Sequence, residues 1–447
     1  MSRPLGTTTR RFLVHACHFR KSINSIRRLY STSHVSIDGI QLPTLEDLYL
    51  KEGDDGEIKH PVRVNWGPLN LTVLFMRNWD PLLSETERED QPTTTSLSYS
   101  GRSAPVGLPN LSPCEWERDW ADVRRVCAHV GVPESDIRLV DLSREYWSRV
   151  FEPAVAVWES GRTPNPDVTC NKEIKFGALM NHIKPGHYLA TGQFSLAWTQ
   201  TDIAGHYARV IRTPTGATLN RAIDMNKDQT YYLSQVQEAQ LAKAVFPLAG
   251  IPKPRVRDLA KHFALPTAER DESMGVCFIG ERGRFGDFVS QYTSPTTTKG
   301  YFVKADGERI TEHRGLHYYT IGQRPRLGGM DGRWFIARKG VGEGEDILLV
   351  PGSDHPALQC EQLWSGDFNW IAGHPPAEMD DGGTLDALVQ VRHRMRPVTG
   401  RVRTDQNRVS VEFPNPVGAV AEGQIVGIWR GEQCLGSGVI DATRCSA

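Results

Sequence analysis

The densest group of chemically useful residues lies in GRTPNPDVTCNKEIKFGALM, residues 161–180. Its prolines enforce a turn, Asp167 is placed to cap the helix that follows, and Cys170 then lies within the first helical turn. Free backbone N–H groups, the positive helix end and nearby Lys172 and Lys175 favour a thiolate there. The segment therefore offers a candidate nucleophile. The alternative is an ordinary capped helix that carries an incidental cysteine.

A second cysteine lies between two glycines in DESMGVCFIGE, residues 271–281. Gly275 and Gly280 flank a short apolar run around Cys277, a pattern typical of a close backbone approach or of a loop that must move. A buried structural cysteine is the alternative. If Cys170 and Cys277 meet in the fold, the two can exchange sulfur through a disulfide or a persulfide.

The eight cysteines, at positions 17, 114, 127, 170, 277, 360, 434 and 445, include no C-x-x-C pair. No histidine pair has the spacing of metal ligands either. The sequence therefore indicates neither a zinc site nor a disulfide framework, and no tightly bound metal is expected.

Two further segments carry charged residues, and the first of them suits a polyanionic partner. Arg392, Arg394 and Arg396 alternate in ALVQVRHRMRP. This predicts a strand that holds the three side chains about 6.6 Å apart on one face, a spacing similar to that of neighbouring phosphates. NKDQTYYL, residues 226–233, predicts a helix start capped by an Asn or an Asp. The alternatives are a solvated strand face and an ordinary helix start with aromatic residues in the core.

The residues around these segments predict alternating strands and helices. LNLTVLFM (69–76) is a short apolar run that suits a buried strand of a parallel sheet. Ser112–Glu115 forms a capping box before an amphipathic helix that ends at Gly131. A strand over 137–140 and a helix capped by Ser143 follow. This order predicts an α/β domain with a largely parallel sheet.

From about residue 300 the pattern changes to strands and turns. YFVKADGERI, residues 301–310, predicts a hairpin with Asp306-Gly307 at its turn. RVSVEF, QIVGIWRG and LGSGVI are β-like runs separated by turn residues. A small antiparallel barrel or sandwich is therefore expected at the C-terminal end.

Nine segments carry a shared pattern in order from about 69 to 440, and the most specific are NPDVTCNKEIKF and GVCFIG. The nine are FMRNWD (75–80), CEWERDWADVRRVC (114–127), EYWSRVF (145–151), GRTPNPDVTCNKEIKFG (161–177), GHYAR (205–209), KDQTYYL (227–233), GVCFIGER (275–282), YYTIGQR (318–324) and CLGSGVI (434–440). Together they resemble the tRNA-uridine 2-sulfurtransferases, the 2-thiouridylases.

This resemblance implies an α/β architecture with an N-type, Rossmann-like ATP-pyrophosphatase domain, a small central domain and a C-terminal antiparallel β-barrel that helps to bind tRNA. It implies that ATP, with Mg²⁺, adenylates the 2-oxygen of the wobble uridine, which a persulfide sulfur then replaces. A cysteine desulfurase relay would donate the sulfur. The expected boundaries are 1–37 for a transit peptide, 38–68 for a linker or disordered segment, 69–282 for the catalytic domain with a disordered loop at 81–112, 283–355 for the central domain and 356–447 for the barrel.

The resemblance also implies roles for single residues. Cys277 matches the cysteine that carries the persulfide, and Cys170 matches the nucleophile that releases its sulfur. The segment that touches the target base matches Asn165, Pro166 and Asp167, with Asp167 as an acid/base group. ATP contacts match Met76 and Gly205. Positions that meet tRNA match His206, Lys227, Asp228, Gln229, Arg392, His393 and Gln424.

The sequence departs from the family in two places. No Ser-Gly-Gly-Val-Asp-Ser loop, whose backbone amides hold the ATP pyrophosphate in the family, precedes the strand at 69–76. The family's first strand and first helix are absent with it. Gln193–Gly205 has the character of an insertion, so either Gly192 or Gly205 is the ATP-contact glycine. We hypothesise a mis-spliced gene model or isoform; the alternative is a degenerate paralogue that binds tRNA without thiolating it.

The first 37 residues contain seven basic residues and no acidic one, with interspersed apolar residues and many Ser and Thr. This composition is typical of an organelle transit peptide, and a disordered basic arm for nucleic acid is the alternative. The overall net charge of −1 thus leaves −8 on the remaining chain. No apolar run approaches the length of a membrane span. We expect a protein of the mitochondrial matrix with no membrane partner. The resemblance to the 2-thiouridylases implies tRNAs for Lys, Glu and Gln as its substrates.

Overall fold

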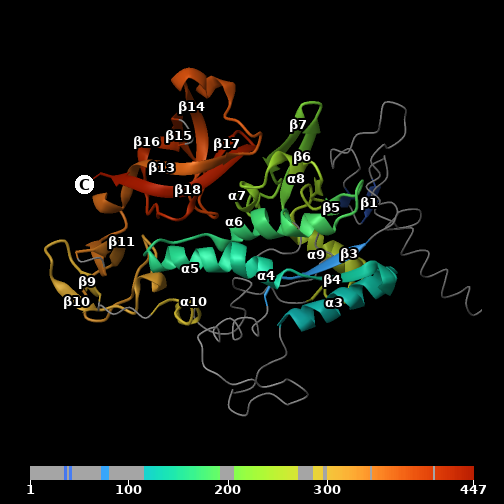
Figure 1. The fold of residues 1–447 in the computed structure, drawn as a ribbon, viewed down its shortest axis with the longest axis horizontal. Coiled ribbons are helices and arrows are strands. Elements are labelled where there is room, and N and C mark those ends of the chain that lie inside the picture. The colour runs from blue at the N-terminus through green and yellow to red at the C-terminus, as the bar shows by residue number, and fades with distance from the viewer. Residues whose placement is uncertain are drawn as a thin grey trace, which may run out of the picture.

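The structure, a computed structural model, describes residues 35–37, 40–42, 72–79, 115–191, 206–269, 285–294, 300–342, 345–405 and 408–446 (Figure 1). Several predictions from the sequence lie outside these ranges. They concern the transit peptide, most of the 38–68 linker, the loop at 81–112, the capping box at Ser112, the insertion Gln193–Gly205 with both candidate glycines, and Cys277. In the described part of the chain, no helix is long and apolar enough to cross a membrane.

The first layer of the α/β domain is built around two parallel strands. β3 (Val73–Arg77) pairs with β4 (Ile137–Asp141) in parallel register, and α3 (Glu115–Val130) connects them. The ring of Phe75 lies 5.3 Å from that of Trp120 on α3, centroid to centroid. The strand predicted within 69–76 and the helix ending at Gly131 are therefore confirmed, and Gly131 takes a φ of +81°.

A continuous helical segment follows β4. It comprises α4 (Ser143–Tyr146), one π-helical turn (Trp147–Phe151) and α5 (Glu152–Glu159). Ser143 does not cap it, because it is already the first helical residue. Asp141, at the end of β4, instead accepts a hydrogen bond from the Ser143 amide at 3.1 Å. The helix was predicted correctly and the capping residue was not.

The next elements return the chain to a second parallel pair. α6 (Pro166–Cys170) runs into a π-helical turn (Asn171–Lys175) and a 3-10 turn (Ala178–His182). β5 (Leu189–Ala190) then pairs in parallel with β8 (Ala244–Val245). Within the described residues β3–β4 and β5–β8 are separate sheets, yet Leu74 and Leu189 pack on one apolar cluster. A largely parallel arrangement is confirmed, in two pieces.

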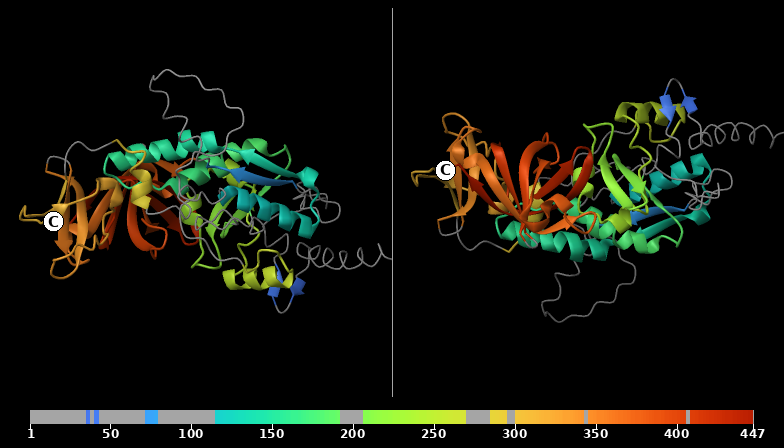
Figure 2. Two further views of the ribbon diagram at one scale, coloured as in Figure 1. Left: turned by 90° about the horizontal axis from the view of Figure 1, so that it is seen from below. Right: turned by 90° about the horizontal axis from the view of Figure 1, so that it is seen from above.

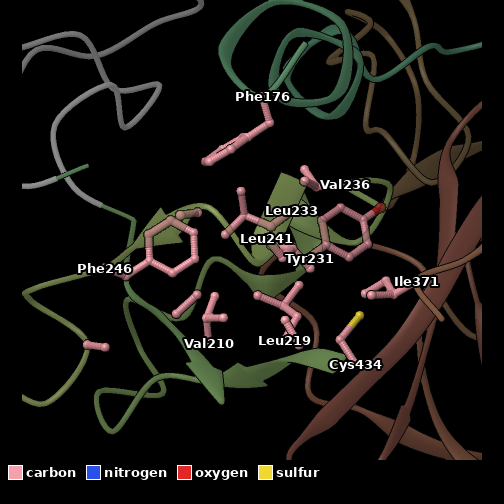
Figure 3. Close-up of a cluster of buried hydrophobic side chains, with 14 of the residues drawn as sticks. Phe176, Val210, Leu219, Tyr231, Leu233, Val236, Leu241, Phe246, Ile371 and Cys434 are labelled. Carbon is pink, nitrogen blue, oxygen red and sulfur yellow. The ribbon is translucent and has the colours of Figure 1, made fainter. Parts of the chain in front are cut away.

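A hairpin and three helices complete this domain. The hairpin consists of β6 (Ala208–Thr213) and β7 (Gly216–Arg221). The helices are α7 (Thr230–Leu233), α8 (Glu238–Leu241) and α9 (Lys253–His262). Figure 3 shows the core shared by the hairpin, α7 and α8, where Leu219, Tyr231 and Phe246 pack together with Cys434 from the far end of the chain.

The central part of the chain forms a four-stranded sheet in the order β10-β9-β12-β11. Its elements are α10 (Phe285–Val289), β9 (Tyr301–Val303), β10 (Arg309–Glu312), β11 (Trp334–Val341) and β12 (Asp346–Pro351). β9 and β10 are antiparallel, and Gly307 between them takes a φ of +86°. The hairpin predicted at Asp306-Gly307 is confirmed.

The C-terminal strands close into an antiparallel barrel, as predicted. They are β13 (Gln359–Trp370), β14 (Thr384–Gln390), β15 (Val398–Asp405), β16 (Arg408–Gly418), β17 (Ile425–Arg430) and β18 (Gln433–Cys445). Pairing of β13 with β18 closes the ring, and β18 also pairs with β7, so the hairpin extends the barrel sheet. Figure 2 shows the barrel and central sheet at one end of the molecule and β3, β4 and α3 at the other. A separate short hairpin joins β1 (Val35–Ile37) to β2 (Ile40–Leu42).

Candidate active site

The turn before α6 carries the first group of candidate residues. Asn165 is the N-cap of α6, since its Oδ1 accepts a hydrogen bond from the Val168 amide at 3.4 Å. Pro166 occupies the first helical position, where its missing N–H costs nothing. The prediction that Asp167 caps the helix is therefore wrong by two residues. Asp167 lies in the first turn, with its side chain partly exposed.

Cys170 is the last residue of α6, five positions after the N-cap Asn165. The prediction that it lies within the first helical turn, among the free N–H groups, is therefore wrong, because the helix begins at Pro166 and not after Asp167. It is only 4% exposed and belongs to an apolar cluster with Val140, Leu142 and Ile174. The five cysteines in the described part of the chain are all free thiols: Cys127, Cys170, Cys360, Cys434 and Cys445. Exchange of sulfur between Cys170 and Cys277 thus stays a prediction, because Cys277 lies outside the described residues.

A buried relay joins α6 to the end of β5. Asn171 Nδ2 donates to the carbonyl of Asp167 at 3.1 Å, and the Asn171 Oδ1 lies 3.0 Å from His206 Nε2. On the other side of the ring, His206 Nδ1 lies 3.1 Å from Thr191 Oγ1. Because the Asn171 oxygen only accepts, Nε2 carries the proton and Nδ1 accepts from the threonine hydroxyl. The relay fixes the imidazole as one neutral tautomer.

His206 is 2% exposed, and each of its two ring nitrogens is hydrogen-bonded to a protein side chain, Thr191 or Asn171. Burial, reinforced by the positive charge of Lys175, holds the pKa of His206 well below its usual value near 6.5. A neutral, enclosed ring is suited to hold α6 in place. Contact of His206 with tRNA stays a prediction that no observation tests.

Asp228 lies inside a polar cluster rather than on a surface. Its carboxylate is 2.9 Å from Arg221 Nη1, and it accepts from the Thr230 hydroxyl at 2.7 Å and from the Ala222 amide at 2.8 Å. The carboxylate thereby ties the end of β7 to the start of α7. Neighbouring Gln229 accepts from the Tyr207 amide at 2.8 Å through its Oε1. Neither Asp228 nor Asn226 caps α7, whose N-cap is Gln229.

The arginine stripe predicted on a strand is not there. β14 ends at Gln390, and residues 391–395 form bends and turns. The physical reason is Gln390, whose Nε2 donates to the carbonyls of Arg392 and His393, which curls the chain back on the strand end. The side chains of Arg392, Arg394 and Arg396 are exposed nonetheless.

The 391–396 turn lies against the 227–232 segment. His393 stacks on Tyr232 with ring centroids 4.3 Å apart, and its Nε2 donates to the Asp228 carbonyl at 3.1 Å. Gln390 Oε1 accepts from Arg221 Nη2 at 3.3 Å. Two of the segments predicted to meet tRNA are therefore neighbours, with partly exposed Lys227 and exposed Arg392 near their junction.

Gln424 joins the barrel to the turn before α6. Its Nε2 donates to the carbonyls of Thr163 and Pro164, both at 3.0 Å. Its Oε1 lies 3.4 Å from Asn165 Nδ2, which donates to it. The amide of this residue is thus engaged with the candidate catalytic turn. A tRNA contact by Gln424 stays a prediction.

The carboxyl end of β3 supplies the described part of a possible nucleotide site. Met76 is partly exposed there, and the buried side-chain amide of Asn78 has no hydrogen-bond partner for its Nδ2 among the described residues. A buried unpaired amide suits a ligand. The sequence offers no binding site for the pyrophosphate of ATP, because it lacks the glycine-rich loop that would hold it. The residues present therefore fit only part of an ATP molecule.

No group of three or more His, Cys, Asp or Glu side chains among the described residues could hold a metal ion.

Two residues that organise the site were not predicted from the sequence. Asn171 lies within the NPDVTCNKEIKF motif, so its presence beside Cys170 was a usable signal. Arg221 had no signal, because its buried pairing with Asp228 depends on the meeting of β7, α7 and the barrel.

Three family models match the chain in order. The model described as the tRNA methyl transferase HUP domain matches residues 70–281, the tRNA methyl transferase PRC-barrel domain matches 286–346, and the aminomethyltransferase beta-barrel domain matches 361–440. These ranges lie within the three domains expected from the sequence.

Curated relatives match most of the chain. One from Levilactobacillus brevis, named tRNA-specific 2-thiouridylase MnmA, is 40% identical over 340 residues, which cover 74% of this chain and 84% of the relative. Relatives of the same name from Burkholderia pseudomallei and Bacillus pumilus are 39% and 40% identical over 337 and 373 residues. Those matches cover 74% and 82% of this chain, and 82% and 87% of the relatives.

Proposed function

Because this chain belongs to the tRNA-specific 2-thiouridylase family, a family of sulfurtransferases, we propose that it transfers sulfur to position 2 of a tRNA uridine. The observation that carries the proposal is the presence of Cys170 on a helix whose cap, Asn165, is held by the barrel residue Gln424. Although the family models are named after methyl transfer, the relatives named 2-thiouridylases match most of the chain.

In the proposed reaction, Cys277 carries a persulfide and the Cys170 thiolate attacks its inner sulfur. The bond between the two persulfide sulfurs breaks, a Cys170–Cys277 disulfide forms, and hydrosulfide leaves with the bonding electron pair. Hydrosulfide then attacks C2 of the uridine, whose activated oxygen leaves. A dithiol reductant returns the disulfide to two thiols. A cysteine desulfurase relay is the proposed source of the persulfide.

The uridine would be held by the turn that precedes Cys170. Asn165, Pro166 and Asp167 lie on a segment fixed by two prolines and by the barrel, which suits an unstacked base that must be placed accurately. Asp167 is the proposed acid/base group, since its side chain is partly exposed at the start of α6. We propose Lys227, Arg392 and His393 as the tRNA contacts nearby, supported by Asp228, Gln229 and His206 from beneath.

ATP use is proposed from the HUP-domain match, with Met76 as a contact. ATP would supply the leaving group on the uridine oxygen. Since this sequence carries no phosphate-binding loop, we infer that thiolation by this chain requires that loop to be restored. The missing phosphate-binding loop also favours a second candidate function, that of a relative that binds tRNA and does not thiolate it.

One assay separates the two candidates. The chain as given and a variant with a Ser-Gly-Gly-Val-Asp-Ser strand-loop-helix segment inserted before the 69–76 strand are each incubated with ATP, Mg²⁺, a persulfide donor and unmodified tRNA. Mass spectrometry then measures 2-thiouridine. Product only with the restored segment supports the proposal. tRNA binding by both proteins, with product from neither, supports the binding protein.

We further propose the mitochondrial matrix as the location and tRNAs for Lys, Glu and Gln as substrates. The basic, acid-free leader within 1–37 supports the location. Import of the radiolabelled chain into isolated mitochondria, compared with a chain that begins at Asp38, tests it. Import of both chains to the same extent would contradict the role of the leader.

A further inference from the structure

Lys339 is a partly buried cation at the contact between the central domain and the turn before α6. It lies on β11 of the central sheet, and its Nζ reaches the Tyr319 carbonyl at 2.8 Å, the Thr163 hydroxyl at 3.3 Å and the Leu316 carbonyl at 3.4 Å. An ammonium has three protons to donate, and three acceptors are present. No carboxylate in the described part of the chain lies within ion-pair distance of Lys339.

The far side of Thr163 is held by the barrel. Its amide donates to the Glu422 carbonyl at 3.0 Å, and its carbonyl accepts from Gln424 at 3.0 Å. Gly423 approaches so closely that a Cβ there would lie 2.9 Å from the Thr163 nitrogen. Thr163 is therefore fixed from two directions, by the barrel through its backbone and by Lys339 through its side chain.

Thr163 is close in sequence to Asn165 and Asp167, the candidate residues of the turn. Pro164 follows it directly, Asn165 is the cap of α6, and Pro166 is the first residue of that helix. Proline restricts φ to a narrow range, so a displacement of Thr163 is passed on to Asn165 and Asp167 rather than absorbed by rotation between them.

We propose that Lys339 is a positioning residue for the sulfur-transfer site, through which docking of the central sheet holds the 163–167 turn in its working geometry. The inference rests on the proposed function of that turn. It assigns to the central domain a task in catalysis besides connecting its neighbours.

The chemistry of Lys339 agrees with this task. Burial lowers the pKa of Lys339 to about 8, so the side chain is still an ammonium at neutral pH and keeps its three donors. Nearby His317 has a pKa lowered by burial and by the charges of Lys339 and Arg314, and Glu159 and His313 also face it. The cation is held mainly by carbonyl and hydroxyl oxygens.

The first test measures hydrogen–deuterium exchange of the full chain. One peptide covers the turn (161–170), and a second covers the β9–β10 hairpin (301–312) for comparison. Lys339→Met keeps the length of the side chain and removes its donors, and we expect exchange in the turn to rise about tenfold. Lys339→Arg should restore protection of the turn. Lys304→Met, next to β9 in the same domain, is the matched control and should leave the turn unchanged.

A second variant keeps the proposal testable if Lys339→Met does not fold. Thr163→Val removes only the acceptor hydroxyl at the other end of the contact and should raise exchange in the turn as well. Unchanged exchange at 161–170 in Thr163→Val and in a folded Lys339→Met would overturn the proposal.

The last measurement uses the chain with the restored phosphate loop. Lys339→Met should lower kcat about tenfold with little change in the KM for tRNA, and Lys339→Arg should recover kcat. An unchanged kcat in Lys339→Met overturns the positioning role. If the restored parent forms no 2-thiouridine, the proposed function fails instead, and the exchange measurement still decides whether Lys339 orders the turn.

Discussion

The Asp228 carboxylate and the Arg221 guanidinium form an ion pair at 2.9 Å in which both side chains are almost fully enclosed. Arg221 also lies over the ring of Trp429, 4.3 Å from its centroid. The pair therefore connects the 227–232 segment to the barrel interior. In this position Asp228 organises the proposed tRNA-binding surface from below.

Asp228→Ala should lower the free energy of unfolding by about 3–5 kcal/mol, because it leaves the Arg221 charge buried without its partner. Urea unfolding followed by circular dichroism measures the change. Asp386→Ala is the control, since Asp386 pairs with Arg401 at 3.1 Å on the exposed surface and should cost no more than about 1 kcal/mol. Equal losses of unfolding free energy in the two variants would show that burial does not increase the contribution of the Asp228–Arg221 pair to stability.

His206→Gln should weaken the dependence of stability on pH. The pKa of His206 is held below 6.5 in the folded protein, so the unfolded chain binds a proton first, and stability falls as the pH drops from about 6.5 through the folded pKa. One such group contributes up to about 1.4 kcal/mol per pH unit. Urea unfolding between pH 5 and 8 measures the slope. The exposed His374→Gln should leave it unchanged, and an equally steep slope in His206→Gln would contradict the assignment.

Cys170→Ser should abolish 2-thiouridine formation in the chain with the restored loop, since an alcohol cannot release sulfur from a persulfide at neutral pH. tRNA affinity should remain within about twofold, because the side chain is buried in an apolar cluster. Mass spectrometry and filter binding measure the two effects. Cys445→Ser, at a partly exposed cysteine of the barrel, is the control and should retain product. Thiolation by Cys170→Ser would remove Cys170 from the mechanism.

Arg394→Gln and Arg396→Gln should each weaken tRNA binding and lower the steepness of its salt dependence by about one unit of slope, if each arginine contacts one phosphate. Binding measured between 50 and 300 mM salt gives the slope. Arg408→Gln, exposed on β16, is the comparison. A slope that falls equally in all three variants would indicate general attraction rather than a site at 391–396.

Local patterns predicted the elements of this fold well. The apolar run at 69–76, the glycine at 131 and Asp306-Gly307 each report on neighbours a few residues away, and each gave the correct strand, helix end or hairpin. Predictions failed where a competing local partner took over. Asn165 rather than Asp167 caps α6 because Pro166 sets the first helical position.

The prediction of an arginine stripe failed because of a contact between residues that are distant in sequence. Alternation in 389–396 suits a strand, but the side chain of Gln390 binds the carbonyls of the next residues and stops it. Gln390 is itself held by Arg221, which is distant in sequence. The candidate site shows the same division: the motif around Cys170 was visible in the sequence, whereas its support by Gln424 needed the barrel to be in place.

The core that surrounds Tyr231 has a consequence for how the protein unfolds. Val168 and Phe176, from the helix that carries Cys170 and the turn after it, share one apolar cluster with Ile425, Trp429 and Cys434 of the barrel. Figure 3 shows Phe176 and Cys434 in this cluster. β18 adds main-chain hydrogen bonds to β7 along the same border. Melting of the barrel would therefore expose one side of the catalytic helix to water, so the two should denature in one cooperative step.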